Sequence, residues 1–277
     1  IIKKWLYSDH DIFFRELISN GCDAITKLKK LEMIGEAELA DDNEFKIQVI
    51  VNSEEKSLTF IDNGIGMTSD EVNEYINQIA FSGAQDFLEK YKDKAGEDQI
   101  IGHFGLGFYS AFMVADRVTI DTLSYKKYAA PVHWESEGGM EFEMGEGDRE
   151  VRGTTIKLFL NEDSYEFSNE YRAREVIEKY CSFMPIPIYF LNATPQEEAE
   201  DEVIDAEVVD GEAVEASEEK EEKKREPVNT PNPLWNKHPN ECTEEEYKKF
   251  YRDVFMDFKE PLFWIHLNMD YPFNLKG

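Results

Sequence analysis

Hydrophobic residues recur at helical spacing between Ser8 and Leu31. At about 100° per residue, apolar side chains fall on one narrow stripe and polar side chains on the opposite side. This pattern predicts a helix packed on a core, with Ser8 as N-cap and Asp11 as a capping-box acid. The stripe holds Phe14, Leu17, Ile18, Gly21, Ile25 and Leu28, and the polar row holds Glu16, Asn20, Asp23 and Lys27. Taken alone, such a polar row is more often a solvated helix face than a functional one.

Alternating apolar residues after this helix predict a β-hairpin over residues 45–51 and 57–61. Its second strand runs into Asp62-Asn63-Gly64-Ile65-Gly66-Met67, and Thr68 or Ser69 can cap a helix beyond it. Further strands are predicted at residues 117–123, 131–135, 140–144, 154–160, 186–191 and 262–267, and helices at 111–115, 170–183 and 244–258. Closely spaced strands that do not alternate regularly with helices favour an α+β fold, a mainly antiparallel sheet with helices on one face.

One segment of the chain is strongly acidic. Fifteen acidic and four basic residues lie between Gln196 and Glu226, while the whole chain of 277 residues has a net charge of −29. Such a run cannot form a core, so residues 195–230 are predicted to be a linker. Strong acidity also argues against a nucleic-acid partner, because phosphates bind Lys and Arg.

The rest of the composition indicates a cytoplasmic protein. The three cysteines are widely spaced, which favours a reducing compartment. No apolar run is long enough to span a membrane. The chain does not begin with Met, which suggests missing upstream residues, and residues 231–277 are too few for an independent core. We therefore expect a first domain over residues 1–194 and the start of a truncated domain after the linker.

Three separate features are candidates for chemistry. Asp62 ends a strand, where its carboxylate can accept a hydrogen bond from an exocyclic amine, and Gly64 and Gly66 can let a flat ring approach. Met67 offers a polarizable floor. A tight turn built on Asp-Asn-Gly explains the same residues at least as well.

The second feature is a glycine cluster at Gly102, Gly105 and Gly107, directly before a predicted helix. Backbone N–H groups in such a turn can hold phosphates, although close packing of a turn is an equally simple reason for the glycines. The cluster matches neither a P-loop nor a dinucleotide fingerprint. The third feature is the polar row, where Asn20 can offer an oxygen to Mg²⁺ and Glu16 can accept a proton from water. The residues alone indicate no more than an unusual Mg-nucleotide site.

Three motifs together resemble the heat-shock protein 90 chaperones, with the bacterial HtpG-type members most similar. They are Arg15-Glu16-Leu17-Ile18-Ser19-Asn20 with Asp23-Ala24, the Asp62–Met67 stretch, and Ile101-Gly102-His103-Phe104-Gly105-Leu106-Gly107-Phe108-Tyr109-Ser110. The linker and Pro233-Leu234-Trp235 resemble that family's charged linker and the start of its middle domain. The resemblance implies a split-Bergerat (GHKL-type) ATPase fold that binds ATP or ADP with Mg²⁺.

The resemblance also implies residue roles. Glu16 would be the general base, Asn20 the Mg²⁺ ligand, and Asp62 the acceptor for the adenine amino group, with Thr154 joined to it through water. Residues 80–107 would form a lid over the nucleotide. The other nucleotide-binding residues implied are Asp23, Gly66, Met67, Gly105, Leu106, Gly107 and Phe108.

The resemblance implies an ATP-dependent chaperone that acts on client proteins, with co-chaperones as further partners and a homodimer in the full-length protein. Phe81 stands where the family often has lysine, and His103 stands where glutamine is usual. The middle-domain arginine and the dimerisation domain are absent, so we expect a monomeric fragment that binds nucleotide and hydrolyses it slowly or not at all. The alternatives are a topoisomerase, mismatch-repair or histidine-kinase ATPase of the same superfamily, and an acidic scaffold without activity.

Overall fold

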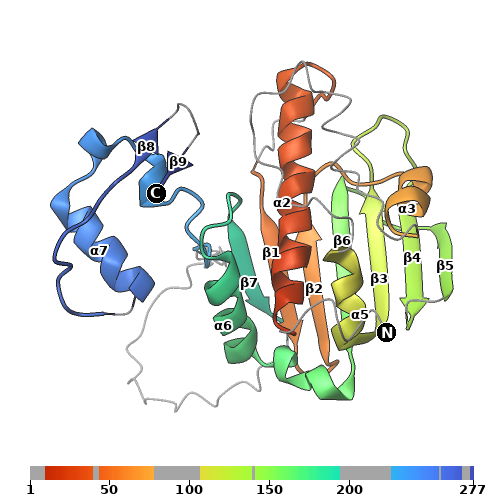
Figure 1. The fold of residues 1–277 in the computed structure, drawn as a ribbon. Helices are drawn as coiled ribbons and strands as arrows, with labels where there is room; N and C mark the ends of the chain where they lie inside the picture. The colour runs from red at the N-terminus through yellow and green to blue at the C-terminus, as the bar shows by residue number, and fades with distance from the viewer. Residues whose placement is uncertain are drawn as a thin grey trace, which may run out of the picture.

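The computed structural model describes residues 10–39, 44–77, 107–138, 141–193, 226–255, 257–269 and 275–277. The elements in chain order are α2 (Ile12–Met33), β1 (Ile47–Asn52), β2 (Ser57–Asp62), α3 (Ser69–Tyr75), η1 (Gly107–Ser110), α5 (Ala111–Val114), β3 (Ala115–Leu123), β4 (Val132–Glu137), β5 (Glu141–Glu146), β6 (Gly153–Leu160), η2 (Glu162–Ser168), α6 (Glu170–Cys181), β7 (Ile188–Asn192), η3 (Leu234–Asn236), η4 (Pro239–Glu241), α7 (Glu244–Phe255), β8 (Asn268–Met269) and β9 (Leu275–Lys276). Figure 1 shows helices packed on one face of a sheet, with the elements after residue 230 beside β7 and α6.

Within the described residues, the main sheet has seven strands in the order β5-β4-β3-β6-β2-β1-β7. All neighbouring strands are antiparallel except β1 and β7, which run parallel. Buried and partly exposed positions alternate along β1, β4 and β7, because helices cover only one face (Figure 1). The α+β expectation is therefore confirmed. Among the helices of the described part, none is long and apolar enough to cross a membrane.

The apolar stripe of α2 is confirmed as the centre of the core. Phe14, Ile18, Ile25 and Leu28 have no exposed surface, and Leu17 is 3% exposed. Figure 1 shows α2 running across the middle of the sheet, over β1 and β2. Burial of this stripe fixes which way the polar row of the helix faces, and so orients the candidate residues on it.

The start of α2 differs from the expectation. Ser8 lies outside the described residues, and the helix begins at Ile12 with Asp11 in the N-cap position, where its side chain makes no capping hydrogen bond. The buried Asp11 carboxylate instead accepts a hydrogen bond from Arg172 at 2.6 Å and lies 3.8 Å from Lys179. The predicted capping pair of Ser8 and Asp11 lies partly outside the described residues, and within them two cations of α6 hold the Asp11 carboxylate.

The hairpin and the helix that follows it match the prediction closely. β2 ends at Asp62, directly opposite Thr154 of β6. The predicted cap after this strand is Thr68: its hydroxyl accepts from the N–H of Glu71, whose carboxylate accepts from the N–H of Thr68 at 2.8 Å. This capping box fixes the chain directly after Met67.

A short segment after the acidic run returns to the first domain. The Val228 N–H donates to Ile188 O at 2.8 Å, and the Thr230 N–H donates to Ser182 O at 2.7 Å. Asn229 is 8% exposed and accepts from the N–H of Ile188 at 2.8 Å. Its side-chain amide donates to the carbonyl oxygens of Met184 and Ile186, just before β7. Residues 228–230, assigned to the linker from the sequence, therefore pack as part of the first domain.

The residues after 230 form a smaller group next to α6. Trp235 lies 4.7 Å from Phe183 and 5.6 Å from Phe250, measured between ring centroids. The strand predicted at residues 262–267 is wrong, because backbone pairing begins only at Leu267, which exchanges hydrogen bonds with Gly277. An apolar run without a neighbouring strand for its backbone does not form a strand.

Candidate functional site

Asp62 occupies a buried position at the end of β2. Its Oδ1 accepts a hydrogen bond from the Gly64 N–H at 2.8 Å, and its side chain is almost without exposed surface. Burial raises the pKa of Asp62 from 3.8 to about 6, while the N–H groups of Gly64 and Thr154 and the positive charge of Arg149 oppose that rise. With a pKa of about 6, the buried carboxyl group is still mainly ionised at neutral pH. An ionised carboxylate is a strong hydrogen-bond acceptor for an amine.

The two glycines after Asp62 are explained by chain packing. A Cβ on Gly64 would lie 2.7 Å from the backbone carbon of Ala24, on α2. Gly66 has φ of +60°, and a Cβ there would lie 1.9 Å from the carbonyl oxygen of Leu123. Both positions therefore need glycine without any ligand, and the glycines bring the Asp62 turn into contact with α2 and β3.

Thr122 is a site residue that the sequence analysis missed. It has no exposed surface, and its Oγ1 accepts from the Met67 N–H at 3.0 Å. The same hydroxyl lies 3.1 Å from Thr154 Oγ1 and donates to Gly153 O at 3.1 Å. Thr122 therefore joins Met67 and Thr154, two residues predicted to bind the same ligand. The only sequence signal was a threonine at a core-facing position of β3.

The polar row of α2 is not a solvated helix face. Glu16 and Asn20 are partly buried, and Asp23 is 5% exposed. A Cβ on Gly107 would lie 2.6 Å from Glu16 Oε2, so the Glu16 carboxylate faces the start of η1. Burial raises the pKa of Glu16, and the charge of Arg15 opposes the rise. A carboxylate with a raised pKa is better matched to accept a proton near neutral pH.

The same helix also reaches Asp62. A Cβ on Gly21 would lie 3.4 Å from Asp62 Cβ, so the Asp62 side chain lies under this turn of α2. Glu16 is five residues before Gly21, about 7.5 Å along the axis at about 1.5 Å per residue. Gly107 therefore lies against α2 at Glu16, and Asp62 lies against the same helix at Gly21, about one and a half turns further on.

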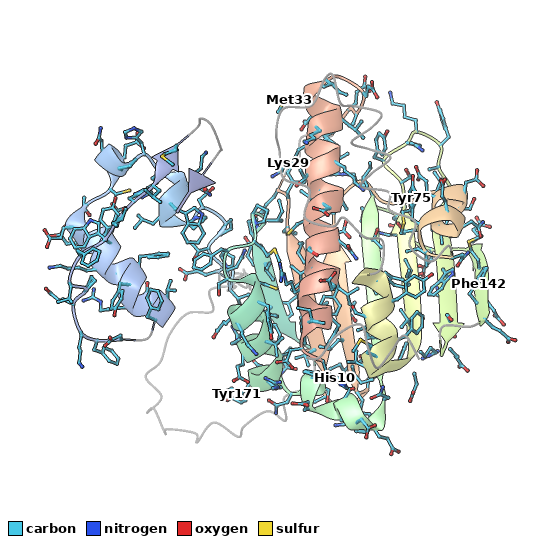
Figure 2. The ribbon with its side chains drawn as sticks, in the orientation of Figure 1. His10, Lys29, Met33, Tyr75, Phe142 and Tyr171 are labelled. Carbon is cyan, nitrogen blue, oxygen red and sulfur yellow. The ribbon has the colours of Figure 1, made fainter. Side chains whose placement is uncertain are left out.

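Phe108 lies in an aromatic group within the core. Its ring centroid is 5.8 Å from that of Trp134 and 5.9 Å from that of Phe112. Phe142, which Figure 2 labels on β5, stacks on the other side of Trp134 at 6.3 Å. Phe81, His103, Gly105, Leu106 and almost all of the predicted lid lie outside the described residues.

The chain just before and just after residues 78–106 is joined by hydrogen bonds. Tyr109 of η1 donates to Ile76 O at 2.7 Å. Trp134 Nε1 donates to Asn77 Oδ1 at 2.9 Å. These bonds hold the residues after α3 beside η1 and β4.

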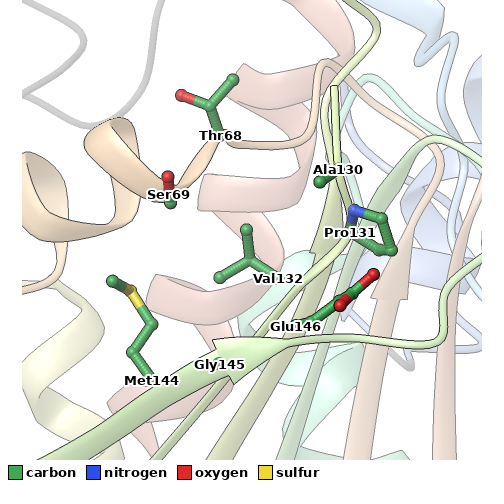
Figure 3. Close-up of a pocket in the computed structure, with 8 residues that line it drawn as sticks. All are labelled: Thr68, Ser69, Ala130, Pro131, Val132, Met144, Gly145 and Glu146. Atoms are coloured by element: carbon green, nitrogen blue, oxygen red, sulfur yellow. The ribbon is translucent and has the colours of Figure 1, made fainter. Parts of the chain in front are cut away.

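A hollow of about 440 Å³ lies elsewhere, between α3 and the β4–β5 edge (Figure 3). Its lining residues are Thr68, Ser69, Ala130, Pro131, Val132, Met144, Gly145 and Glu146. None of the predicted site residues is among them, and its walls are mainly apolar with Glu146 as the one carboxylate. The hollow is therefore distinct from the candidate site around Asp62.

Comparisons with known proteins agree with this geometry. Residues 13–137 match the family model described as "Histidine kinase-, DNA gyrase B-, and HSP90-like ATPase", and residues 166–277 match "Hsp90 protein". Chaperone protein htpG of Bacteroides fragilis strain 638R is 48% identical over 285 residues, covering 100% of this chain and 37% of the relative. HtpG of Bacteroides thetaiotaomicron is 47% identical over 279 residues, and that of Porphyromonas gingivalis strain W83 is 43% identical over 277, with the same coverage.

The sheet, the helices on one face and the acidic strand end define an α+β ATPase domain of the class shared with histidine kinases and DNA gyrase B. The similarity over the whole chain identifies the family within this class: the chain belongs to the Hsp90 family and corresponds to the N-terminal region of its HtpG-type members. The resemblance drawn from the motifs is confirmed, and the other ATPases of the class are not favoured. The chain spans about 37% of the length of these relatives.

Proposed function

We propose that the chain is the nucleotide-binding region of an ATP-dependent chaperone, and that the site between α2 and the end of β2 binds ATP and hydrolyses it in the full-length protein. The relatives named as chaperones support the cellular role. The observation that supports the site best is the pair of carboxylates along α2. Glu16 faces the glycine turn at Gly107, and Asp62 lies buried under Gly21.

Asp62 accepts a hydrogen bond from the adenine amino group. Its Oδ1 is already held by Gly64, so the carboxylate is oriented before the base arrives. Thr154 joins this hydrogen-bond network through water, and Thr122 holds both Thr154 and the Met67 backbone in place. Met67 lines the adenine pocket. Preorganised groups of this kind lose little entropy on binding.

The phosphate end of the nucleotide lies toward Glu16 and Gly107. Glu16 accepts a proton from the attacking water, which suits its raised pKa. Backbone N–H groups at the start of η1 bind the phosphates. The further nucleotide contacts we propose are Asp23, Gly66, Gly105, Leu106 and Phe108.

The donor set also suits Mg²⁺. Asn20 lies one turn after Glu16 on the same side of α2 and offers an amide oxygen, which a hard cation prefers. Mg²⁺ commonly takes one or two protein oxygens together with phosphate oxygens. Asn20 would hold the ion against the phosphates, and when bound the ion would neutralise phosphate charge.

The domain division follows the sequence with one change. The first domain comprises residues 1–194 together with residues 228–230, the acidic run lies between these two parts, and residues 231–277 begin the middle domain. In the full-length protein we propose a cytoplasmic homodimer that acts on client proteins with co-chaperones, and we propose that this chain alone is monomeric with little turnover. The described cysteines carry free thiols, which is consistent with a reducing compartment.

The test is ATP turnover by the full-length protein with Glu16→Gln. We expect ATP binding to persist and hydrolysis to fall by at least about 100-fold, because general-base catalysis contributes about that much. Glu32→Gln, at the other end of α2, is the matched control and should hydrolyse ATP like the parent. Hydrolysis at the parent rate in Glu16→Gln would show that the base is a different residue.

A further inference from the structure

Arg149 reaches from the turn between β5 and β6 to the end of β2. Its Nη2 donates to the carbonyl oxygen of Asp62 at 3.2 Å and lies 3.4 Å from Arg152 O. Its Nε donates to Val151 O at 2.9 Å, and its Nη1 donates to the Thr155 hydroxyl. One planar guanidinium therefore joins the last residue of β2 to the first residues of β6.

The glycine at the start of β6 makes room for this contact. Gly153 has φ of +115°, and a Cβ there would lie 2.1 Å from Asp62 O and 3.0 Å from Arg149 Nη2. The backbone at Gly153 thus leaves space for Arg149 to reach the strand end. Arg149 binds the Asp62 backbone, while the Asp62 carboxylate accepts from the Gly64 N–H.

Among the described residues, Arg149 is the cation whose charge acts on the Asp62 carboxylate. From α2, Cys22 lies close enough for the Asp62 charge to act on its thiol, whose pKa is raised mainly by burial, so the thiol is neutral at pH 7. From the β5–β6 turn, the guanidinium of Arg149 lowers the pKa of Asp62 and offsets part of the burial cost. Burial lowers the pKa of Arg149, while Asp62 and Asp121 raise it. An arginine stays charged throughout the physiological range.

We propose that Arg149 is a positioning residue for adenine recognition: it fixes the end of β2 from behind and supports the Asp62 carboxylate that meets the amino group. This inference rests on the proposed nucleotide site and adds to it a residue outside the three motifs. Arg149 touches no ligand in this account. It acts through Asp62 by two separable means, its hydrogen bonds and its charge.

Two variants separate the hydrogen bonds from the charge. Arg149→Gln removes the charge and keeps an amide donor, while Arg149→Lys keeps the charge and removes the planar fork. The matched control is Arg117→Met, since Arg117 lies on the same sheet, pairs with Glu135 at 3.6 Å, and does not contact Asp62. The measurement is the affinity for ADP with Mg²⁺ by titration calorimetry at pH values from about 5 to 8.5, with folding checked by circular dichroism.

The parent should lose affinity as the pH falls through the pKa of Asp62, about 6. Loss of a neighbouring positive charge raises a carboxyl pKa by about one unit. The midpoint for Arg149→Gln should therefore lie about one unit higher, and at pH 6.5 the charge loss alone should weaken binding about threefold. Arg149→Lys should keep the parent midpoint, and it should bind ADP more weakly than the parent by a factor that does not change with pH. Arg117→Met should match the parent.

A pH profile of Arg149→Gln that superimposes on that of the parent would overturn the inference and leave the proposed nucleotide site intact. If Arg149→Gln does not fold, Arg149→Lys decides: a uniformly lower affinity with the parent midpoint supports the inference, and a moved midpoint or an unchanged affinity overturns it. A parent that binds no ADP at any pH would overturn the proposed site itself, and the inference with it.

Discussion

Asp62→Asn should make the protein more stable above about pH 6, although it removes a residue that we place in the binding site. In the folded protein the pKa of Asp62 is about 6, against 3.8 for an unburied aspartate. The folded state therefore keeps a proton that the unfolded state has already lost. Because the folded pKa is raised, the free energy of unfolding falls as the pH rises from about 4 to about 6, and stays lowered above that.

The size of the effect follows from the shift. About two pKa units at about 1.36 kcal/mol per unit give about 3 kcal/mol of stability lost at neutral pH through this one charge. Asparagine keeps an oxygen that can accept from the Gly64 N–H and carries no charge. Asp62→Asn should therefore match the parent near pH 4 and exceed it by up to about 3 kcal/mol at pH 7.5.

The assay is urea unfolding of both proteins at several pH values. With an m value of about 2 kcal/mol/M, the unfolding midpoint of the variant should lie about 1.5 M higher at pH 7.5 and coincide with the parent at pH 4. Equal midpoints at pH 7.5, or a lower midpoint for Asp62→Asn, would refute the reasoning that burial makes this charge costly.

Three further predictions follow from contacts that the structure describes. Thr122→Val keeps the shape but removes a hydroxyl with three partners, so the free energy of unfolding should fall by about 2–4 kcal/mol in urea titrations. The partly exposed Thr59→Val should stay within about 0.5 kcal/mol, and equal effects would contradict the role assigned to Thr122. Gly66→Ala should lower the melting temperature well below that of Gly35→Ala, because both glycines have positive φ but only Gly66 meets a backbone carbonyl at 1.9 Å; similar melting temperatures would show that the strand end can move. Asn229→Ala should speed amide hydrogen exchange of residues 228–230 by at least about 10-fold, since three buried hydrogen bonds are lost; unchanged exchange would mean that the segment is held by other contacts.

The parts of the fold that could be predicted from sequence are those set by local periodicity. The stripe on α2 and the alternation along β1 and β2 each follow from neighbouring residues along the chain, and both are confirmed. The structure begins α2 at Ile12, and the Asp11 carboxylate binds Arg172, a partner far away in sequence that no local pattern indicates. The prediction of a strand at residues 262–267 was wrong, because the apolar content of a segment does not show whether a neighbouring strand is present.

Some residues of the candidate site could be proposed from the sequence and others could not. Glu16, Asn20 and Asp62 were proposed because their motifs resemble a known family, and the structure places Asp62 against α2, the helix that carries Glu16. Thr122 was missed because its hydrogen-bond partners lie 31 or more residues away in the chain. Arg149 was missed because its contact with Asp62 spans 87 residues. No local pattern distinguishes them from other polar residues on strands and turns.

Titration of ADP with Mg²⁺ into this chain and into Asp62→Asn tests the central claim most directly. A hydrogen bond to a charged carboxylate contributes about 1.5–3 kcal/mol, so the variant should bind about 10- to 100-fold more weakly at pH 7.5. Asp116→Asn is the matched control, because Asp116 lies on β3 and is exposed. Weaker binding in Asp62→Asn alone is the predicted result, and equal affinity in all three proteins would contradict the proposed adenine site.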